Sequence, residues 1–126
     1  MAAPATVDEY IAGFPPEVAE RLVRVRAEIV DAVTSATGTR PEQKVRYGIA
    51  AIMLGGRYAL HFAGWKKHIG LYPVPDLPEP LESEIAPYRA EKDSVVFPHS
   101  KDVPYELIGR IAREIADERV RQSAEG

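Results

Sequence analysis

The sequence predicts one α+β domain over residues 1–126, in which an antiparallel β-sheet is covered by helices from the N- and C-terminal parts of the chain. Apolar residues recur at helical spacing before residue 38 and again after residue 104. Short β-type runs, separated by glycine or proline, fill the region between these two segments. The connections between the runs are too short for helical crossovers, so neighbouring strands are expected to be antiparallel.

The N-terminal part predicts two helices. Thr6, followed by two acidic residues, is a typical N-cap for a helix over 7–12 that Gly13 ends. A long helix is expected over 16–37, up to Gly38. Its buried stripe is predicted from apolar residues at steps of three and four, namely Val18, Leu22, Val25, Ile29 and Val33.

The middle of the chain predicts short strands over 44–47, 49–54, 57–63 and 69–72. Gly55 and Gly56 supply the positive φ of a hairpin turn between the second and third strands. A stiff proline-containing connection then leads to a short helix over 81–88 and a strand over 94–97. Pro104 opens the last helix at a first-turn position, and its apolar face comprises Leu107, Ile108, Ile111 and Ile115.

Composition and charge narrow the classes of function. The formal net charge is −3, from 16 Lys and Arg against 19 Asp and Glu, and both signs are mixed along the chain, so a nucleic-acid partner is not expected. The absence of cysteine excludes disulfides, thiolate zinc sites and thiol nucleophiles. Residues 1–6 lack a signal-peptide pattern, and no run approaches the roughly 18 apolar residues of a membrane span. We therefore expect a cytoplasmic protein without a membrane partner.

The densest candidate ligand site lies at 65–73. Strand alternation places His68, Gly70 and Tyr72 on one face of a strand, and the missing side chain at Gly70 leaves room between the imidazole and the phenol. Lys67 adds a positive charge and Trp65 borders the face, so a small anionic or polar ligand on an open sheet face is one interpretation. In the alternative, Gly70 admits a packed neighbour, while His68 and Tyr72 make local hydrogen bonds.

Two further residues are candidates for the same site. His61, between small same-face neighbours on the preceding strand, could approach His68 across the strands. Two imidazoles with a carboxylate could bind iron or zinc, although no His-Glu-x-x-His spacing is present. Tyr47, with Arg46 beside it, resembles a strand end that faces a cleft. Because no nucleophile elbow and no phosphate-binding loop is recognisable, we expect a protein that is not an enzyme.

A series of short motifs resembles the YdhG-like family over about residues 6–119. The motifs are Tyr10 before Phe14-Pro15, Tyr47-Gly48, Lys67-His68-Ile69-Gly70-Leu71-Tyr72-Pro73, Val96-Phe97-Pro98 and Val103-Pro104-Tyr105-Glu106-Leu107-Ile108. The resemblance implies an α+β domain similar in outline to frataxin. It also implies a role in iron handling, because some members are described as intracellular iron chaperones.

The resemblance thus implies a non-enzymatic carrier that needs no cofactor and takes ferrous iron as cargo through surface carboxylates. The candidate metal ligands are Glu17, Glu20 and Asp31 on the long helix and Glu42 before the first strand. The alternative function is a small-ligand or protein-partner binding module that uses the sheet face around His68 and Tyr72. A homodimer is a further expectation, because an unpaired strand edge invites pairing.

Overall fold

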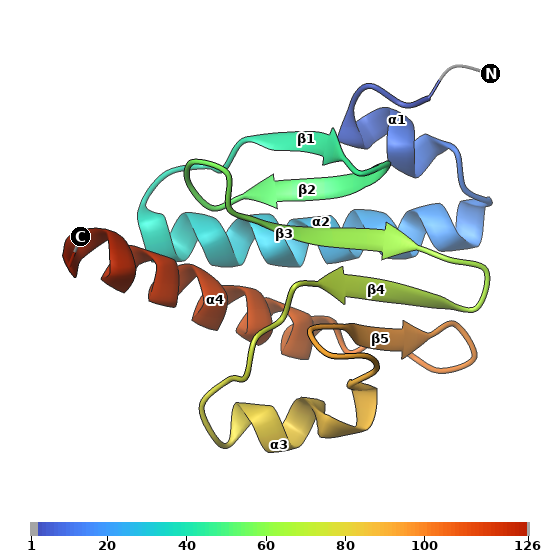
Figure 1. Cartoon of the computed structure of the whole chain (residues 1–126). Helices are drawn as coiled ribbons and strands as arrows, with labels where there is room; N and C mark the ends of the chain where they lie inside the picture. The colour runs from blue at the N-terminus through green and yellow to red at the C-terminus, as the bar shows by residue number, and fades with distance from the viewer. Residues whose placement is uncertain (1–2, 126) are drawn as a thin grey trace.

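The computed structural model describes residues 3–125, which form a five-stranded antiparallel sheet with a layer of helices on one side (Figure 1). The strands follow one another across the sheet in chain order, β1-β2-β3-β4-β5. The elements are α1 Val7–Ala12, α2 Pro16–Thr37, β1 Gln43–Arg46, β2 Ile49–Met53, β3 Ala59–Gly64, β4 His68–Tyr72, α3 Leu81–Ile85, η1 Ala86–Tyr88, β5 Val95–Pro98 and α4 Tyr105–Glu125. The predicted α+β fold, with an N-terminal long helix and a C-terminal helix on an antiparallel sheet, is confirmed.

The helix ends lie where the capping residues place them. The Thr6 hydroxyl accepts a hydrogen bond from the Glu9 amide at 3.1 Å and caps α1. Pro16 occupies the first turn of α2, where its missing N–H has no intrahelical partner to lose. Gly38 ends α2 with φ +79°, a left-handed conformation that glycine adopts without a Cβ penalty. The single helix expected over 81–88 is divided into α3 and a 3-10 turn that contains Pro87, which has no amide hydrogen to donate.

The core lies between the sheet and the pair of long helices. Antiparallel pairing aligns Ala50, Phe62, Leu71 and Val95 across four strands, and all four are fully buried against the helix layer. From α2 and α4 the core receives Leu22, Val25, Ile29, Val30, Val33, Ile108, Ile111, Ala112, Ile115 and Ala116. Each large apolar side chain buried in this way contributes about 1.5–3 kcal/mol, so this layer supplies most of the fold's stability.

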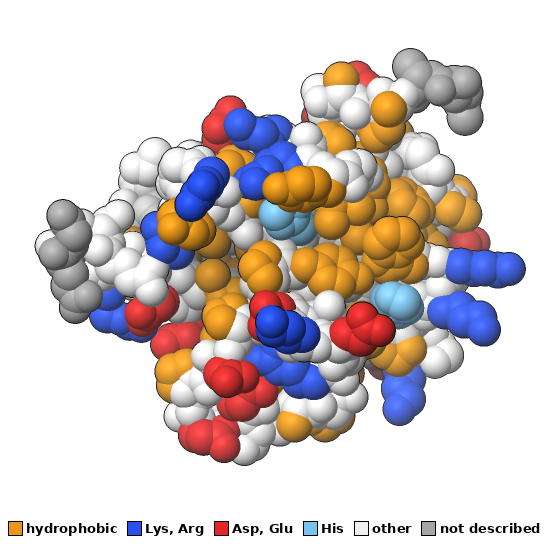
Figure 2. Space-filling view, in the orientation of Figure 1, with side chains coloured by type: hydrophobic (Ala, Val, Ile, Leu, Met, Phe, Trp, Pro, Cys, Tyr) orange, Lys and Arg blue, Asp and Glu red, His pale blue; other side chains and the backbone are white. Residues whose placement is uncertain are grey.

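The second face of the sheet is turned away from α2 and α4. In Figure 1 both helices lie behind the strands, so the view is onto this face. By strand register it carries Arg46, Ala51, Met53, His61, Ala63, His68, Gly70, Tyr72 and Val96. Figure 2 shows that hydrophobic side chains gather on this face, with Lys and Arg side chains along its upper and right borders and Asp and Glu side chains along its lower border. No helix among residues 3–125 has the length and apolar composition needed to cross a bilayer.

Candidate functional site

The uncovered side of the sheet brings together four of the ring-bearing residues that the sequence singles out. Tyr47, His61, Trp65 and Tyr72 contact one another in series, and we refer to these four residues as the aromatic face. The side chains of Tyr47 and Trp65 are among the most exposed large apolar groups of the described residues, at 83% and 46%. His68 and Lys67 lie at one end of the face, where β3 turns into β4.

Tyr47 is held on the face by a tight turn. Arg46 and Ile49 pair across β1 and β2, so Tyr47 and Gly48 alone form the connection. Their φ angles are +55° and +77°, the pattern of a type I′ hairpin turn. A residue with a Cβ costs roughly 1–2 kcal/mol in this left-handed region, and tyrosine lacks the short polar side chain of the usual occupants. The Tyr47 ring lies 5.7 Å from the His61 ring, between centroids, and is tilted by 48° to it.

His61 is the buried polar residue at the centre of the face. Its side chain is 8% exposed, and its Nδ1 lies 3.2 Å from the Tyr72 carbonyl oxygen. Because a carbonyl can only accept, Nδ1 carries the proton of this hydrogen bond, and Nε2 is left as a buried lone pair with no partner among the described residues. Burial lowers the pKa of His61, and the Arg46 cation adds to this effect, while the bond to Tyr72 opposes it. At neutral pH the imidazole is therefore an uncharged acceptor.

Tyr72 and Trp65 are joined by a hydrogen bond across the face. The indole Nε1 donates to the Tyr72 hydroxyl at 2.9 Å. The Tyr72 ring reaches Trp65 by passing over Gly70, where a Cβ would lie 1.9 Å from the hydroxyl oxygen. The room at Gly70 is thus occupied by Tyr72 itself, as in the second of the two alternatives considered for this segment.

The expectation that His61 approaches His68 is wrong. The register pairs His61 with Tyr72, and the Trp65 amide donates to the His68 carbonyl, so Trp65 is the residue opposite His68. The two histidines are therefore four residue positions apart along the strands, about 13 Å at strand spacing. The cause is the tight β3–β4 turn, which sequence alternation alone did not locate.

The charge around the face differs from that of the whole chain. Residues 43–75 contain no Asp or Glu and five cations, namely Lys44, Arg46, Arg57, Lys66 and Lys67. All 19 acidic residues and the remaining 11 basic residues belong to the rest of the chain. The two signs are therefore not mixed in the segment that forms β1 to β4, contrary to the expectation for the whole chain, and a count of charge for each segment reveals this.

The carboxylates proposed as iron ligands are exposed and dispersed. One groove of about 400 Å³ is lined by Glu17, Glu20 and Asp102. Arg21 and Arg24 line the same groove. Asp31 lies 11 residues beyond Glu20 on α2, about 16 Å along the helix. The Glu42 carboxylate lies 3.7 Å from Lys44 Nζ. Within residues 3–125 no three or more His, Cys, Asp or Glu side chains are grouped so that they could hold a metal ion.

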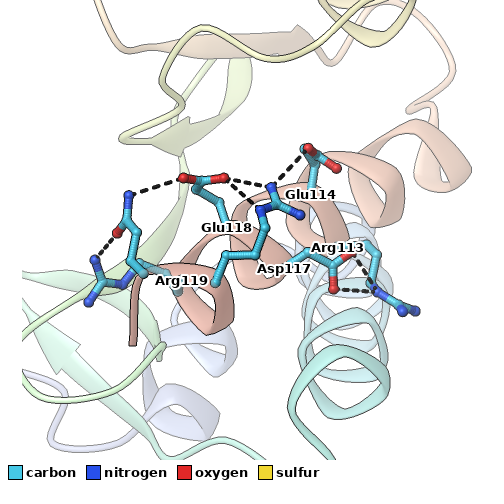
Figure 3. Close-up of polar contacts among 7 residues, drawn as sticks. Arg113, Glu114, Asp117, Glu118 and Arg119 are labelled. Atoms are coloured by element: carbon cyan, nitrogen blue, oxygen red, sulfur yellow. Dashed lines mark hydrogen bonds and ion pairs between the residues drawn. The ribbon is translucent and has the colours of Figure 1, made fainter. Parts of the chain in front are cut away.

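A second polar cluster lies on α4 (Figure 3). Arg121 lies 2.6 Å from Glu118 and 3.6 Å from Glu114, and Arg113 lies 3.1 Å from Asp117. Glu118 also accepts from Gln122 at 3.3 Å, and Gln122 accepts from Arg119. These are pairs between residues one or two turns apart on the exposed side of one helix, and such pairs stabilise a helix only weakly. The cluster therefore has a structural explanation.

No protein-family model, curated protein or solved structure matches this chain. The YdhG-like resemblance and the frataxin-like outline stay predictions, and the aromatic face must be interpreted from its own geometry.

Proposed function

We propose that this protein is a non-catalytic binding module whose partner contacts the aromatic face. The observation that carries the proposal is the row formed by Tyr47, His61, Tyr72 and Trp65 on a sheet face that α2 and α4 do not cover. A contiguous apolar surface bordered by charged side chains is typical of interaction sites. Tyrosine and tryptophan suit such sites because they combine a large apolar surface with a polar atom.

The Tyr47 turn supports binding at this face more than a role in folding. The residue is in a costly backbone conformation, yet 83% of its side chain is exposed, so the fold gains little burial from the ring. The ring nevertheless lies against His61, whose Nε2 has no partner among the described residues. A partner that displaces the ring and supplies a hydrogen-bond donor would satisfy this acceptor.

Binding without chemistry agrees with the groups present. General acid–base catalysis needs proton-transferring side chains within hydrogen-bond reach of a substrate. The imidazole of His61 is neutral and buried, and residues 43–75, which supply all four residues of the aromatic face, contain no Asp or Glu. The iron-carrier role is supported by the sequence resemblance alone.

The dye 8-anilinonaphthalene-1-sulfonate, a flat aromatic anion, tests the proposal. We expect it to shift the backbone amide resonances of β3 and β4 and to change the fluorescence of Trp65, which is the single tryptophan of the chain. Trp65→Ala should weaken dye binding about 2- to 10-fold, the range of one aromatic contact. Tyr58→Ala is the matched control, because Tyr58 is 47% exposed but lies under the Arg119 guanidinium of α4. Resonance shifts confined to the helices, or an equal effect of both variants, would contradict the proposal.

A further inference from the structure

We infer that the partner of the aromatic face is a single-stranded nucleic acid, an inference that rests on the proposed function. Charge provides the first argument. The strands and turns from Gln43 to Tyr72 present cations to solvent and no acidic side chain, whereas the rest of the chain has 19 acidic against 11 basic residues. Lys44 is paired with Glu42, so the cations left to attract a phosphate backbone to this face are Arg46, Arg57, Lys66 and Lys67.

The shape of the face provides the second argument. Well-formed cavities of 210–420 Å³ lie elsewhere on residues 3–125, at α2, α4 and the β2–β3 turn, and none of these is lined by Tyr47, His61, Trp65 or Tyr72. Small-molecule sites are concave and enclose most of their ligand. An open sheet surface with exposed rings instead suits unpaired bases, which stack on aromatic side chains.

The spacing of the cations provides the third argument. Lys66 and Lys67 lie in the turn after β3, and Arg57 lies in the turn before it, so the length of this six-residue strand, about 20 Å, separates them. The Arg46 guanidinium lies at the Arg57 end, because its Nη1 donates to the Arg57 carbonyl at 2.8 Å. One phosphate group cannot contact both ends, whereas a strand of several nucleotides can.

A base-paired duplex does not fit this arrangement. Reading the major groove requires an inserted helix or a two-stranded ribbon, and the uncovered face of a five-stranded sheet provides neither. Stacking on Tyr47 and Trp65 also requires bases that are unstacked from their own neighbours. The face therefore selects single strands, with the cations contacting phosphates and the rings contacting bases.

Fluorescence anisotropy of the full chain with labelled oligonucleotides of about 12 nucleotides, oligo-dT and oligo-rU, tests the inference. We expect binding that weakens with salt, by about 0.7 in the log–log slope for each phosphate contacted. The double variant Lys66→Glu/Lys67→Glu should bind at least about 10-fold more weakly and reduce the slope by about 1.4. Trp65→Ala should weaken binding without changing the slope. The control Arg113→Glu/Arg121→Glu makes the same charge change on α4 and should leave binding near that of the wild type.

The possible failures are distinguishable. If neither oligonucleotide binds at about 25 mM salt while the naphthalene dye still binds the face, the nucleic-acid inference is wrong and the proposed function stands. If the dye does not bind either, both are wrong. A duplex of equal length that binds as tightly as the single strand, or adenosine monophosphate that competes equally per nucleotide, would also overturn the inference. An equal loss of binding in the α4 control would show that net charge acts without the aromatic face.

Discussion

The Tyr72 ring occupies the space above Gly70, so that a Cβ at residue 70 would lie 1.9 Å from the Tyr72 hydroxyl oxygen and 2.3 Å from its Cζ. This contact lets the hydroxyl reach Trp65 Nε1 at 2.9 Å. Glycine at position 70 therefore shapes the aromatic face, because any other side chain would displace the ring that connects its two ends.

Gly70→Ala should destabilise the protein by about 1–3 kcal/mol, the range found when an extra group is forced into a filled site. It should also shift the emission of Trp65, because the displaced Tyr72 can no longer accept the indole hydrogen bond. Urea unfolding followed by circular dichroism, together with tryptophan emission spectra, measures both effects.

The double variant Gly70→Ala/Tyr72→Ala provides the control for this contact. With the ring removed, the added methyl group has space, so the two changes should be less than additive in the free energy of unfolding. Wild-type stability and emission in Gly70→Ala would show that the ring does not depend on this glycine.

The sequence predicted most of the fold because its signals are local. Thr6, Pro16 and Gly38 determine helix ends through capping and backbone geometry that act within one turn, and these ends were predicted to the residue. The strands were predicted to within two residues for the same reason, since side-chain alternation is visible in any short window. The type I′ turn was missed because Tyr47 is not among the residues that favour positive φ.

The site was less predictable because it depends on register. Whether His61 faces Tyr72 or His68 is decided by how tightly β3 turns into β4, and a change of a few positions in that turn moves the pair by several ångströms along the strand. The filling of the Gly70 site depends on the rotamer of Tyr72, which alternation does not specify. The face to which each residue belongs was predictable, but their contacts were not.

Tyr47→Asn should raise the free energy of unfolding by about 0.5–1 kcal/mol, because asparagine before Gly48 tolerates the left-handed region that the turn requires. The same change removes the ring that lies against His61 and should weaken binding at the aromatic face. Tyr47→Phe, which keeps the ring and the backbone strain, should match the wild type in stability. Chemical denaturation measures the three variants, and an asparagine variant less stable than the phenylalanine variant would argue against strain at this turn.

Arg89→Lys should destabilise the protein by about 1–3 kcal/mol. The Arg89 guanidinium donates to both carboxylate oxygens of Glu82, at 3.0 and 2.8 Å, and to the carbonyls of Val74 and Pro75, at 2.5 and 2.7 Å. A lysine ammonium lacks this planar set of donors, so several acceptors would lose their partner. Urea unfolding and faster amide exchange at Leu77, whose N–H donates to Glu82, report the loss. Unchanged exchange there would show that Arg89 does not hold this connection.

Anaerobic calorimetric titration with ferrous iron tests the carrier role that the resemblance implies. Because Glu17, Glu20, Asp31 and Glu42 are exposed and spread along the molecule, we expect a weak response, equal for iron and magnesium. Saturable, iron-selective binding in the micromolar range would instead support the carrier. Loss of that binding in Glu17→Gln/Glu20→Gln would assign the ion to the groove that these residues share with Asp102.

Acidification should destabilise the native state through His61. Burial holds the pKa of His61 below its usual 6.5, so between 6.5 and the lower native value the unfolded chain binds a proton that the native protein does not. Stability is therefore unaffected by this group above about pH 7 and falls as the pH decreases through that window. A pKa raised by folding would give the opposite sign, with stability gained on acidification.

His61→Gln removes this titration while His68 and His99 remain, so the difference between the two proteins isolates His61. Between about pH 7.5 and pH 5.5 the wild type should lose up to about 1 kcal/mol more free energy of unfolding than the variant. Urea titrations at both pH values measure this difference. Equal losses in the two proteins would mean that His61 accepts a proton in the native protein as readily as in the unfolded chain. In that case its Nε2 would be accessible to solvent.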